Sequence, residues 1–182
     1  MAHAAAGPPS TVAPLVAIGT GAVVALALGI YASAHTPTGH AITTLGFSSM
    51  IAMKVWLAIV AGVLALGQLV GGLWMYGRLG RPAPAWVGPA HRSAGFLAVL
   101  VSLPVAYHCL WALGFGTADA RTIAHSVLGC VFYGAFVVKV FSVHGRTEPK
   151  WLLPSAAVTM LVSLAIVVST SALWYLTAVG TP

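Results

Sequence analysis

The stretch LPVAYHCLWALGFGTADARTIAHSVLGC, residues 103–130, contains the end of one apolar segment, a short polar turn and the start of another apolar segment. Each apolar arm belongs to a segment with the ~20 residues that a helix needs to cross a bilayer core. The stretch therefore predicts a helical hairpin inside a membrane. His108 lies on the first arm and His125 on the second. Ionisable residues at membrane depth are costly, which indicates a function for these two imidazoles.

The composition of the whole chain excludes a soluble domain of any size. Hydrophobic residues make up 59% of the 182 residues and charged residues only 5%, against roughly 25% in soluble proteins. The formal net charge of +6 comes from basic residues spread between apolar segments, as the positive-inside rule produces, and does not indicate nucleic-acid binding. The sequence therefore predicts an all-α integral membrane protein whose first partner is the lipid bilayer.

Five apolar stretches are long enough to span a bilayer, at residues 12–34, 51–76, 92–114, 122–143 and 152–176. Helices are the expected structure because lipid offers no partner for unpaired backbone groups. We expect one transmembrane domain over residues 12–176, built as a five-helix bundle with a four-helix core. A mobile tail precedes it at residues 1–11, and a short C-terminal tail follows it at 177–182.

The basic residues predict the orientation of the bundle. One group lies around the second and fourth connections and contains Arg78, Arg81, Arg92, Lys139, Arg146 and Lys150, whereas the other side has only Lys54 and Arg121. The positive-inside rule assigns the first group to the cytoplasm. This predicts an N-terminus inside, a C-terminus outside and a multi-pass location in the bacterial inner membrane.

Four histidines fall on the third and fourth expected helices. Because these helices are antiparallel neighbours, His108 is level with His125 near the outer side, and His91 is level with His144 near the inner side. Two neutral imidazoles at one depth are the arrangement that holds a haem iron by its two axial positions. The spacing therefore predicts that the four histidines bind one or two b-type haems.

The helical wheel separates the two pairs. At about 100° per residue, the 17 residues from His91 to His108 leave His108 turned to one side of His91 around the helix axis. The 19 residues from His125 to His144 leave His144 turned to the opposite side of His125. If one pair faces across the helix interface, the other points to one side of it. We therefore favour the outer pair as the haem site.

Other interpretations of these residues remain open. Two histidines at matched depth also form simple interhelical hydrogen bonds, either with each other or with Tyr107, Tyr133 or Gln68. Among the cations, Arg92, Arg121 and Lys139 suit haem propionates, but side chains of this kind also act as topology determinants that reach the headgroups. Cys109 and Cys130 are expected to stay free and to pack as small hydrophobes.

Two short motifs resemble those of cytochrome b561-type membrane proteins. The motifs are HRSAG at 91–95 and HSVLG at 125–129, and the resemblance implies a helical bundle with two b-type haems that passes electrons across the membrane. It also implies ligand roles for His91 and His125. That family takes the partner ligands from the starts of two other helices, where this chain has Lys54 and Trp151, so His108 and His144 would have to replace them.

The longer string WVGPAHRSAGFLAVLVSLPVAYHCLWALGF, residues 86–115, is similar to a family of small bacterial five-helix membrane proteins of unknown function. Taken together, these features predict a membrane-embedded b-type cytochrome that exchanges electrons with membrane or periplasmic redox proteins and is able to form oligomers. The alternative is a haem-free accessory or assembly subunit of a larger respiratory complex. An electron-transfer role is the most that the sequence predicts as enzyme activity.

Overall fold

The computed structural model describes residues 12–145 and 149–182, and these ranges contain helices and connections but no strand. The helices are α1 (Val12–Ala34), α2 (Met50–Met75), α3 (Val87–His108), α4 (Ala120–His144), α5 (Leu152–Val168) and α6 (Trp174–Ala178). Two π-helical turns, η1 (Cys109–Leu113) and η2 (Ser169–Leu173), continue α3 and α5. Five helical runs are long and apolar enough to cross a membrane, which confirms the expected multi-pass membrane protein.

The ends of the helices follow from local sequence. The Ser49 side chain accepts a hydrogen bond from the amide of Ala52 at the start of α2, and Asp119 forms a capping box with Thr122 at the start of α4. Helix α3 begins at Val87 rather than at residue 92. The loop between α2 and α3 is therefore shorter than expected. Pro89 falls in the first turn of α3, where a missing amide hydrogen costs nothing.

Not every expected boundary can be compared with the structure. The predicted tail at 1–11 and the basic residue Arg146 lie outside the described residues. At the other end, the last span continues without interruption from Leu152 through η2 and α6 to Ala178. The last span therefore ends two residues later than the predicted end at residue 176.

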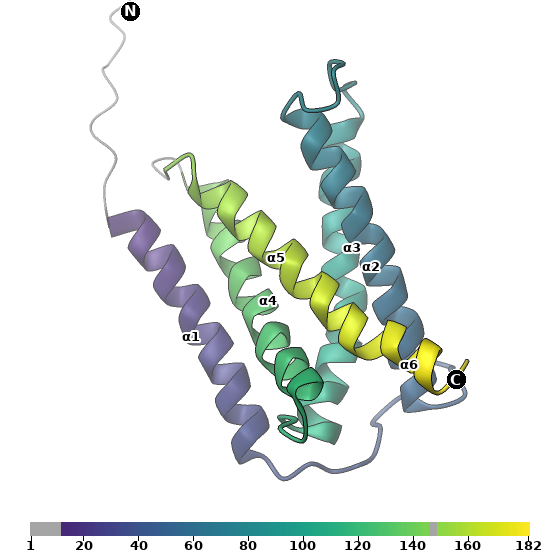
Figure 1. Ribbon diagram of the computed structural model, residues 1–182. Coiled ribbons are helices and arrows are strands. Elements are labelled where there is room, and N and C mark those ends of the chain that lie inside the picture. The colour runs from purple at the N-terminus through teal and green to yellow at the C-terminus, as the bar shows by residue number, and fades with distance from the viewer. Residues whose placement is uncertain (1–11, 146–148) are drawn as a thin grey trace, which may run out of the picture.

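The helices form two groups that meet at one end of the bundle (Figure 1). Helices α2 and α3 are an antiparallel pair, while α4 lies between α1 and α5 and packs against both. The last helical run reaches α2 through η2, and the two groups diverge toward the opposite end, where α2 ends and α3 begins. An all-helical bundle is thus confirmed, whereas a closed four-helix core stays a prediction.

Buried side chains join the two groups where they meet. The main hydrophobic cluster is shared by α2, α4, α5 and η2 and consists of Val55, Ala58, Phe132, Leu164, Val168 and Ala172. Outside it, α1 and α4 approach each other so closely that a Cβ built on Gly21 or Gly134 would lie 2.6 Å from the carbonyl oxygen of the other glycine. Glycine at both positions is what lets the two backbones meet.

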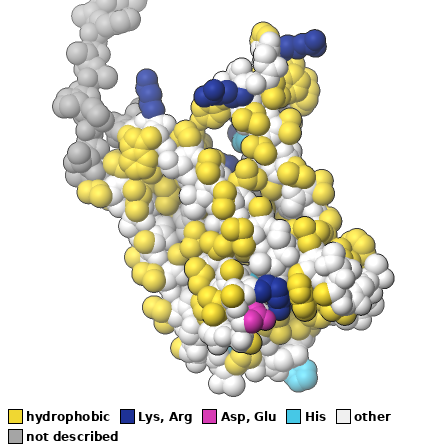
Figure 2. Space-filling view, viewed as in Figure 1, with side chains coloured by type: hydrophobic (Ala, Val, Ile, Leu, Met, Phe, Trp, Pro, Cys, Tyr) yellow, Lys and Arg dark blue, Asp and Glu magenta, His cyan; other side chains and the backbone are white. Residues whose placement is uncertain are grey.

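Charged side chains are distributed unevenly over the two ends of the molecule (Figure 2). Lys and Arg side chains gather at the end that carries the α2–α3 and α4–α5 connections, where Arg78, Arg81 and Lys150 lie in the sequence. At the opposite end, Arg121 pairs with Asp119 at 3.8 Å. The basic residues are therefore concentrated on one side of the apolar belt.

Candidate functional site

His108 is a fully buried imidazole with one nitrogen unused. The side chain is 1% exposed, and its Nδ1 lies 2.7 Å from the carbonyl oxygen of Pro104 one turn earlier. Because a carbonyl only accepts, Nδ1 carries the proton and donates it, which leaves a lone pair on Nε2. That Nε2 atom is buried and has no hydrogen-bond partner among residues 12–145 and 149–182.

His125 is the second histidine of the expected outer pair, and it lines a cavity inside the bundle. Its Nδ1 lies 3.4 Å from the hydroxyl oxygen of Thr170, whose own proton goes to the carbonyl of Ile166 at 2.6 Å. The hydroxyl therefore accepts from Nδ1–H, and Nε2 again keeps its lone pair. The Cys109 thiol donates toward this Nε2 across 3.9 Å.

The structure places His108 and His125 at the same end of α3 and α4 but does not turn them toward each other. The ring nitrogens of His125 bond to Thr170 and Cys109, so the direct histidine–histidine bond is not formed in the part of the chain that is described. His108 is not among the residues that line the cavity at His125. Cys109, which comes directly after His108, occupies the position opposite His125.

The expected inner pair lies on helix ends that separate. His91 sits one turn into α3 against α2, where a Cβ on Gly71 would lie 3.2 Å from its Nδ1. That nitrogen is buried, and no residue that the structure describes bonds to it. The exposed His144 donates from Nδ1 to the carbonyl of Val140 at 2.9 Å. The start of α3 and the end of α4 stand apart in the view of the fold (Figure 1).

The expected propionate partners differ in what they contact. Arg121 is occupied by the protein, because it donates to the Thr170 carbonyl at 2.8 Å and its guanidinium lies 3.8 Å from the centre of the Trp174 ring. Arg92 is exposed near the start of α3, and Lys139 is half-buried on α4. The structure therefore does not bring the three cations to one site.

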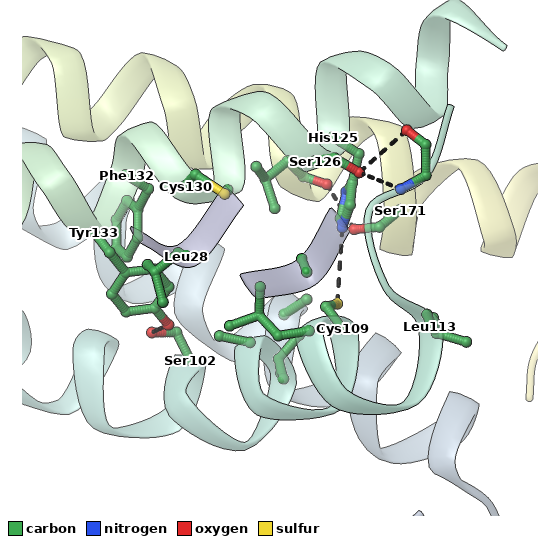
Figure 3. Close-up of a pocket in the computed structure, with 18 of the residues that line it drawn as sticks. Leu28, Ser102, Cys109, Leu113, His125, Ser126, Cys130, Phe132, Tyr133 and Ser171 are labelled. Atoms are coloured by element: carbon green, nitrogen blue, oxygen red, sulfur yellow. Dashed lines mark hydrogen bonds between the residues drawn. The ribbon is translucent and has the colours of Figure 1, made fainter. Parts of the chain in front are cut away.

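The cavity lies between α3 and α4, which each pack mainly against other helices. Its volume is about 240 Å³, and most of its lining is apolar side chain. Figure 3 shows two hydrogen-bonded pairs at its opposite ends, Cys109 with His125 and Ser102 with Tyr133. Each pair joins α3 to α4 across the cavity.

The π-helical turns shape the end of the cavity that contains His125. Cys109 opens η1, while Thr170 and Ser171 lie in η2 and donate their hydroxyls to the carbonyls of Ile166 and Val167, both at 2.6 Å. Hydroxyls that compete for helix carbonyls bend helices, and π-turns of this kind often occur at functional sites. Both turns thus adjoin the same histidine.

A short turn closes the same end of the cavity. The Phe115 amide donates to the Ala32 carbonyl at 3.0 Å, and the Gly116 amide donates to the Ser126 hydroxyl at 3.0 Å. Gly114 has φ +69°, and a Cβ there would lie 2.8 Å from the Pro37 ring. The turn is therefore fastened to both α1 and α4.

Sequence reasoning missed most of this site. Cys109 is read from sequence as a small hydrophobe, and Ser102 receives no role, although the two lie seven residues apart, on η1 and α3, and both line the cavity. On α4, Tyr133 follows His125 by eight residues, and Gly129 stands midway between them. The sequence does contain a signal of this cavity, namely polar residues two helical turns apart with a small residue between them.

The donor atoms of the outer histidines suit haem iron, but the space between the helices does not suit a porphyrin. Both imidazoles hold a proton on Nδ1 and a lone pair on Nε2, as axial ligands do. An apolar cavity of about 150 Å³ holds benzene, so one of 240 Å³ takes a substituted single ring and not four pyrroles. Within the described ranges, no three His, Cys, Asp or Glu side chains converge as ligands of one metal ion.

Comparison with known proteins identifies the family of this chain but no individual protein that is similar to it. No curated protein and no solved structure matches the chain, so the motifs shared with cytochrome b561-type proteins gain no support from that side. One family model covers residues 12–182, which is nearly the whole chain. The protein therefore belongs to the Family of unknown function DUF6529.

Proposed function

We propose that this protein binds a small, mainly apolar molecule inside the bilayer, in the cavity between α3 and α4. The observation that carries the proposal is the cavity of about 240 Å³ with a thiol–imidazole pair at one end. Ligand sites in proteins share this character, since they are largely apolar and contain a few placed polar groups. The polar pair supplies orientation, and the apolar wall supplies most of the binding energy.

The size of the cavity favours an occupant over an empty void. The apolar side chains around a space of about 240 Å³ lack packing contacts that an occupant would supply. Gly129 has a cost of its own, because glycine inside a helix is roughly 1 kcal/mol worse than alanine. A Cβ on Gly129 would meet nothing within 4 Å, so this glycine leaves the space open.

A thermal-shift measurement with para-xylene tests the proposal. The wild-type protein should melt at a higher temperature in a saturable way, by the equivalent of roughly 2.7 kcal/mol at a hundredfold excess over Kd. Gly129→Leu fills the cavity and should abolish the shift. The matched control Gly67→Leu, at an exposed α2 position that also has open space around it, should keep the shift. Equal shifts in all three proteins would contradict the proposal.

The proposed setting is a bacterial inner membrane, with the basic end of the bundle in the cytoplasm. The positive-inside rule supports this orientation, because Arg78, Arg81 and Lys150 lie at one end. An odd number of spans then places the N-terminus inside and the C-terminus outside. Reaction of cysteines introduced in the connections with an impermeant maleimide on intact cells distinguishes this orientation from its inverse.

Electron transfer by a b-type haem is a second candidate function. It is favoured by the unused Nε2 of the fully buried His108, whose Nδ1 is held by the Pro104 carbonyl, and by the motif resemblance to cytochrome b561-type proteins. Haem would have to widen the gap between α3 and α4, because the cavity holds one ring. It would bring one-electron redox chemistry to the bundle, and His108 and His125 would be the residues that hold it.

A pyridine haemochrome assay after haem-supplemented expression decides this second candidate. A b-type spectrum that is lost in His108→Ala and kept in His40→Ala, a change at an exposed loop histidine, would support it. Protein that purifies folded but without a haem spectrum would exclude it and leave the small-ligand proposal in place.

A further inference from the structure

The two hydrogen-bonded pairs of the cavity lie at opposite ends of one apolar slot. Ser102 on α3 and Cys109 at the start of η1 are seven residues apart, and His125 and Tyr133 are eight residues apart on α4. At 1.5 Å per residue, these spacings are about 10 and 12 Å. These are separations of Cα atoms along the helix axes. Because both pairs bridge the same two helical runs, the two polar ends of the slot are separated by a similar distance, about 11 Å.

The middle of this slot is lined by very small residues. Ala106 lies between Ser102 and Cys109 on α3, and Gly129 lies between His125 and Tyr133 on α4, and both residues line the cavity. A Cβ on Gly129 would find no atom within 4 Å. Small residues on both facing helices leave room for a flat ring between them.

The span between the two ends matches one class of ring. A ligand oxygen lies about 2.8 Å from each protein partner, which leaves roughly 5 Å between two oxygens on the ligand. Two oxygens on opposite corners of a six-membered ring, each on a bond of about 1.2–1.4 Å, have this separation. A ligand with one polar atom, or with two on adjacent corners, reaches only one end of the slot.

The hydrogen-bonding roles at each end select the reduced form of such a ring. The Nε2 of His125 carries one lone pair, which the Cys109 thiol reaches only across 3.9 Å, so a ligand hydroxyl that displaces this weak thiol contact is accepted there. At the other end, Ser102 donates to the Val99 carbonyl and also bonds Tyr133 at 2.8 Å. Because the Ser102 proton goes to Val99, the bond within the pair uses the Tyr133 proton. The pair therefore accepts from a ligand hydroxyl as it stands, and it donates to a ligand oxygen only if one of these two bonds breaks.

We propose that the cavity binds the ring of a para-quinol, with one hydroxyl donating to His125 Nε2 and the other bonded to the Ser102–Tyr133 pair. This inference rests on the proposed function, because it names the chemical class that the cavity takes. The oxidised ring has two carbonyl oxygens, which only accept, and at the His125 end only the Cys109 thiol offers them a proton. The quinol therefore binds more tightly than the quinone.

Calorimetric titration of the full-length protein in nanodiscs, with empty nanodiscs subtracted, tests this assignment. The probes are 1,4-benzoquinol under anaerobic conditions, 1,4-benzoquinone, and para-xylene, in which methyl groups replace both hydroxyls. His125→Leu and Tyr133→Phe should each weaken quinol binding by about 2- to 10-fold, the loss of one neutral hydrogen bond. Neither change should alter para-xylene binding, and quinone should bind wild type more weakly than quinol by a similar factor.

The outcomes separate the two proposals. If both variants bind quinol as wild type does, or lose quinol and para-xylene binding equally, the quinol assignment is wrong while the cavity remains a ligand site. If para-xylene and quinol both fail to bind wild type, or bind Gly129→Leu equally well, the proposed function is wrong too. Unchanged helical circular dichroism and melting temperature of Tyr133→Phe confirm folding, since Ser102 keeps its bond to the Val99 carbonyl.

Discussion

Cys109 and His125 lie 3.9 Å apart across the gap between α3 and α4, with the thiol donating toward an imidazole nitrogen. This contact occupies the position that matched depth assigns to His108. Because α3 packs mainly against α2, its rotation buries His108 and points the next residue into the cavity. The rotation of α3 about its axis thus decides which side chain meets His125.

Close approach of α1 and α4 predicts a steric effect at their crossing. Gly21→Ala should destabilise the protein by about 1–3 kcal/mol, since its Cβ would lie 2.6 Å from the Gly134 carbonyl oxygen and backbone has to move. Gly19→Ala is the matched control, because a Cβ there meets nothing within 4 Å. Thermal unfolding in detergent, followed by circular dichroism, measures both; equal melting temperatures for the two variants would contradict the crossing.

The closing turn predicts a difference between two glycines of similar φ. Gly114 and Gly39 have φ of +69° and +70°, so alanine is strained at both positions. At Gly114 ψ is also −167°, a conformation that is essentially confined to glycine. Only at Gly114 does the new Cβ also meet the Pro37 ring, at 2.8 Å. Gly114→Ala should therefore lower the melting temperature more than Gly39→Ala, and the reverse order would show that the turn does not pack against Pro37.

Arg121 should act as a structural residue of the α4–α5 contact. Arg121→Lys loses the ring stacking on Trp174 and the geometry of the bond to the Thr170 carbonyl, so we expect a loss of roughly 1–3 kcal/mol in unfolding free energy. Arg78→Lys, in the exposed α2–α3 connection, is the control and should have no measurable effect. If Arg121→Lys is as stable as wild type, the contacts of Arg121 with Trp174 and Thr170 do not stabilise the fold, and the prediction is wrong.

The capping box of α4 predicts a pH effect on stability. The bonds that Asp119 accepts from Thr122 hold the pKa of its carboxylate below its usual value of 3.8. Since the folded state favours the ionised form, the stabilisation is present above that value and is lost as the pH falls below it. In melting curves between pH 3 and 6, Asp119→Asn should lose less stability on acidification than wild type, because its cap does not titrate; parallel curves would contradict this.

The sequence predicted the spans well and the site only in part. Hydropathy locates the five membrane helices, and the polar turn around Asp119 fixes α3 and α4 as antiparallel neighbours, so the depth of His125 follows directly. The orientation of a side chain around its helix depends on the partner that the helix packs against. In a chain where every face is apolar, hydrophobic periodicity does not reveal that partner.

The π-helical turns were beyond sequence reasoning for a related reason. They shift the helix faces after Cys109 and around Thr170, and their formation depends on competition for a few carbonyls in the folded protein. The pairing of Tyr133 with Ser102 illustrates the consequence, since Tyr133 was considered as a partner for a histidine. Its actual partner, at 2.8 Å, lies on the same face of α3 as Cys109.

Labelling of Cys109 in a Cys130→Ser background tests the central claim, an open ligand cavity between α3 and α4, most directly. Methyl methanethiosulfonate transfers its methylthio group to the thiolate and releases methanesulfinate, and mass spectrometry gives the rate. We expect saturating para-xylene or the Gly129→Leu change to slow the labelling of Cys109 at least several-fold, while Gly67→Leu leaves the rate unchanged. A rate that neither para-xylene nor Gly129→Leu alters would show that Cys109 does not face a cavity that a ligand can fill.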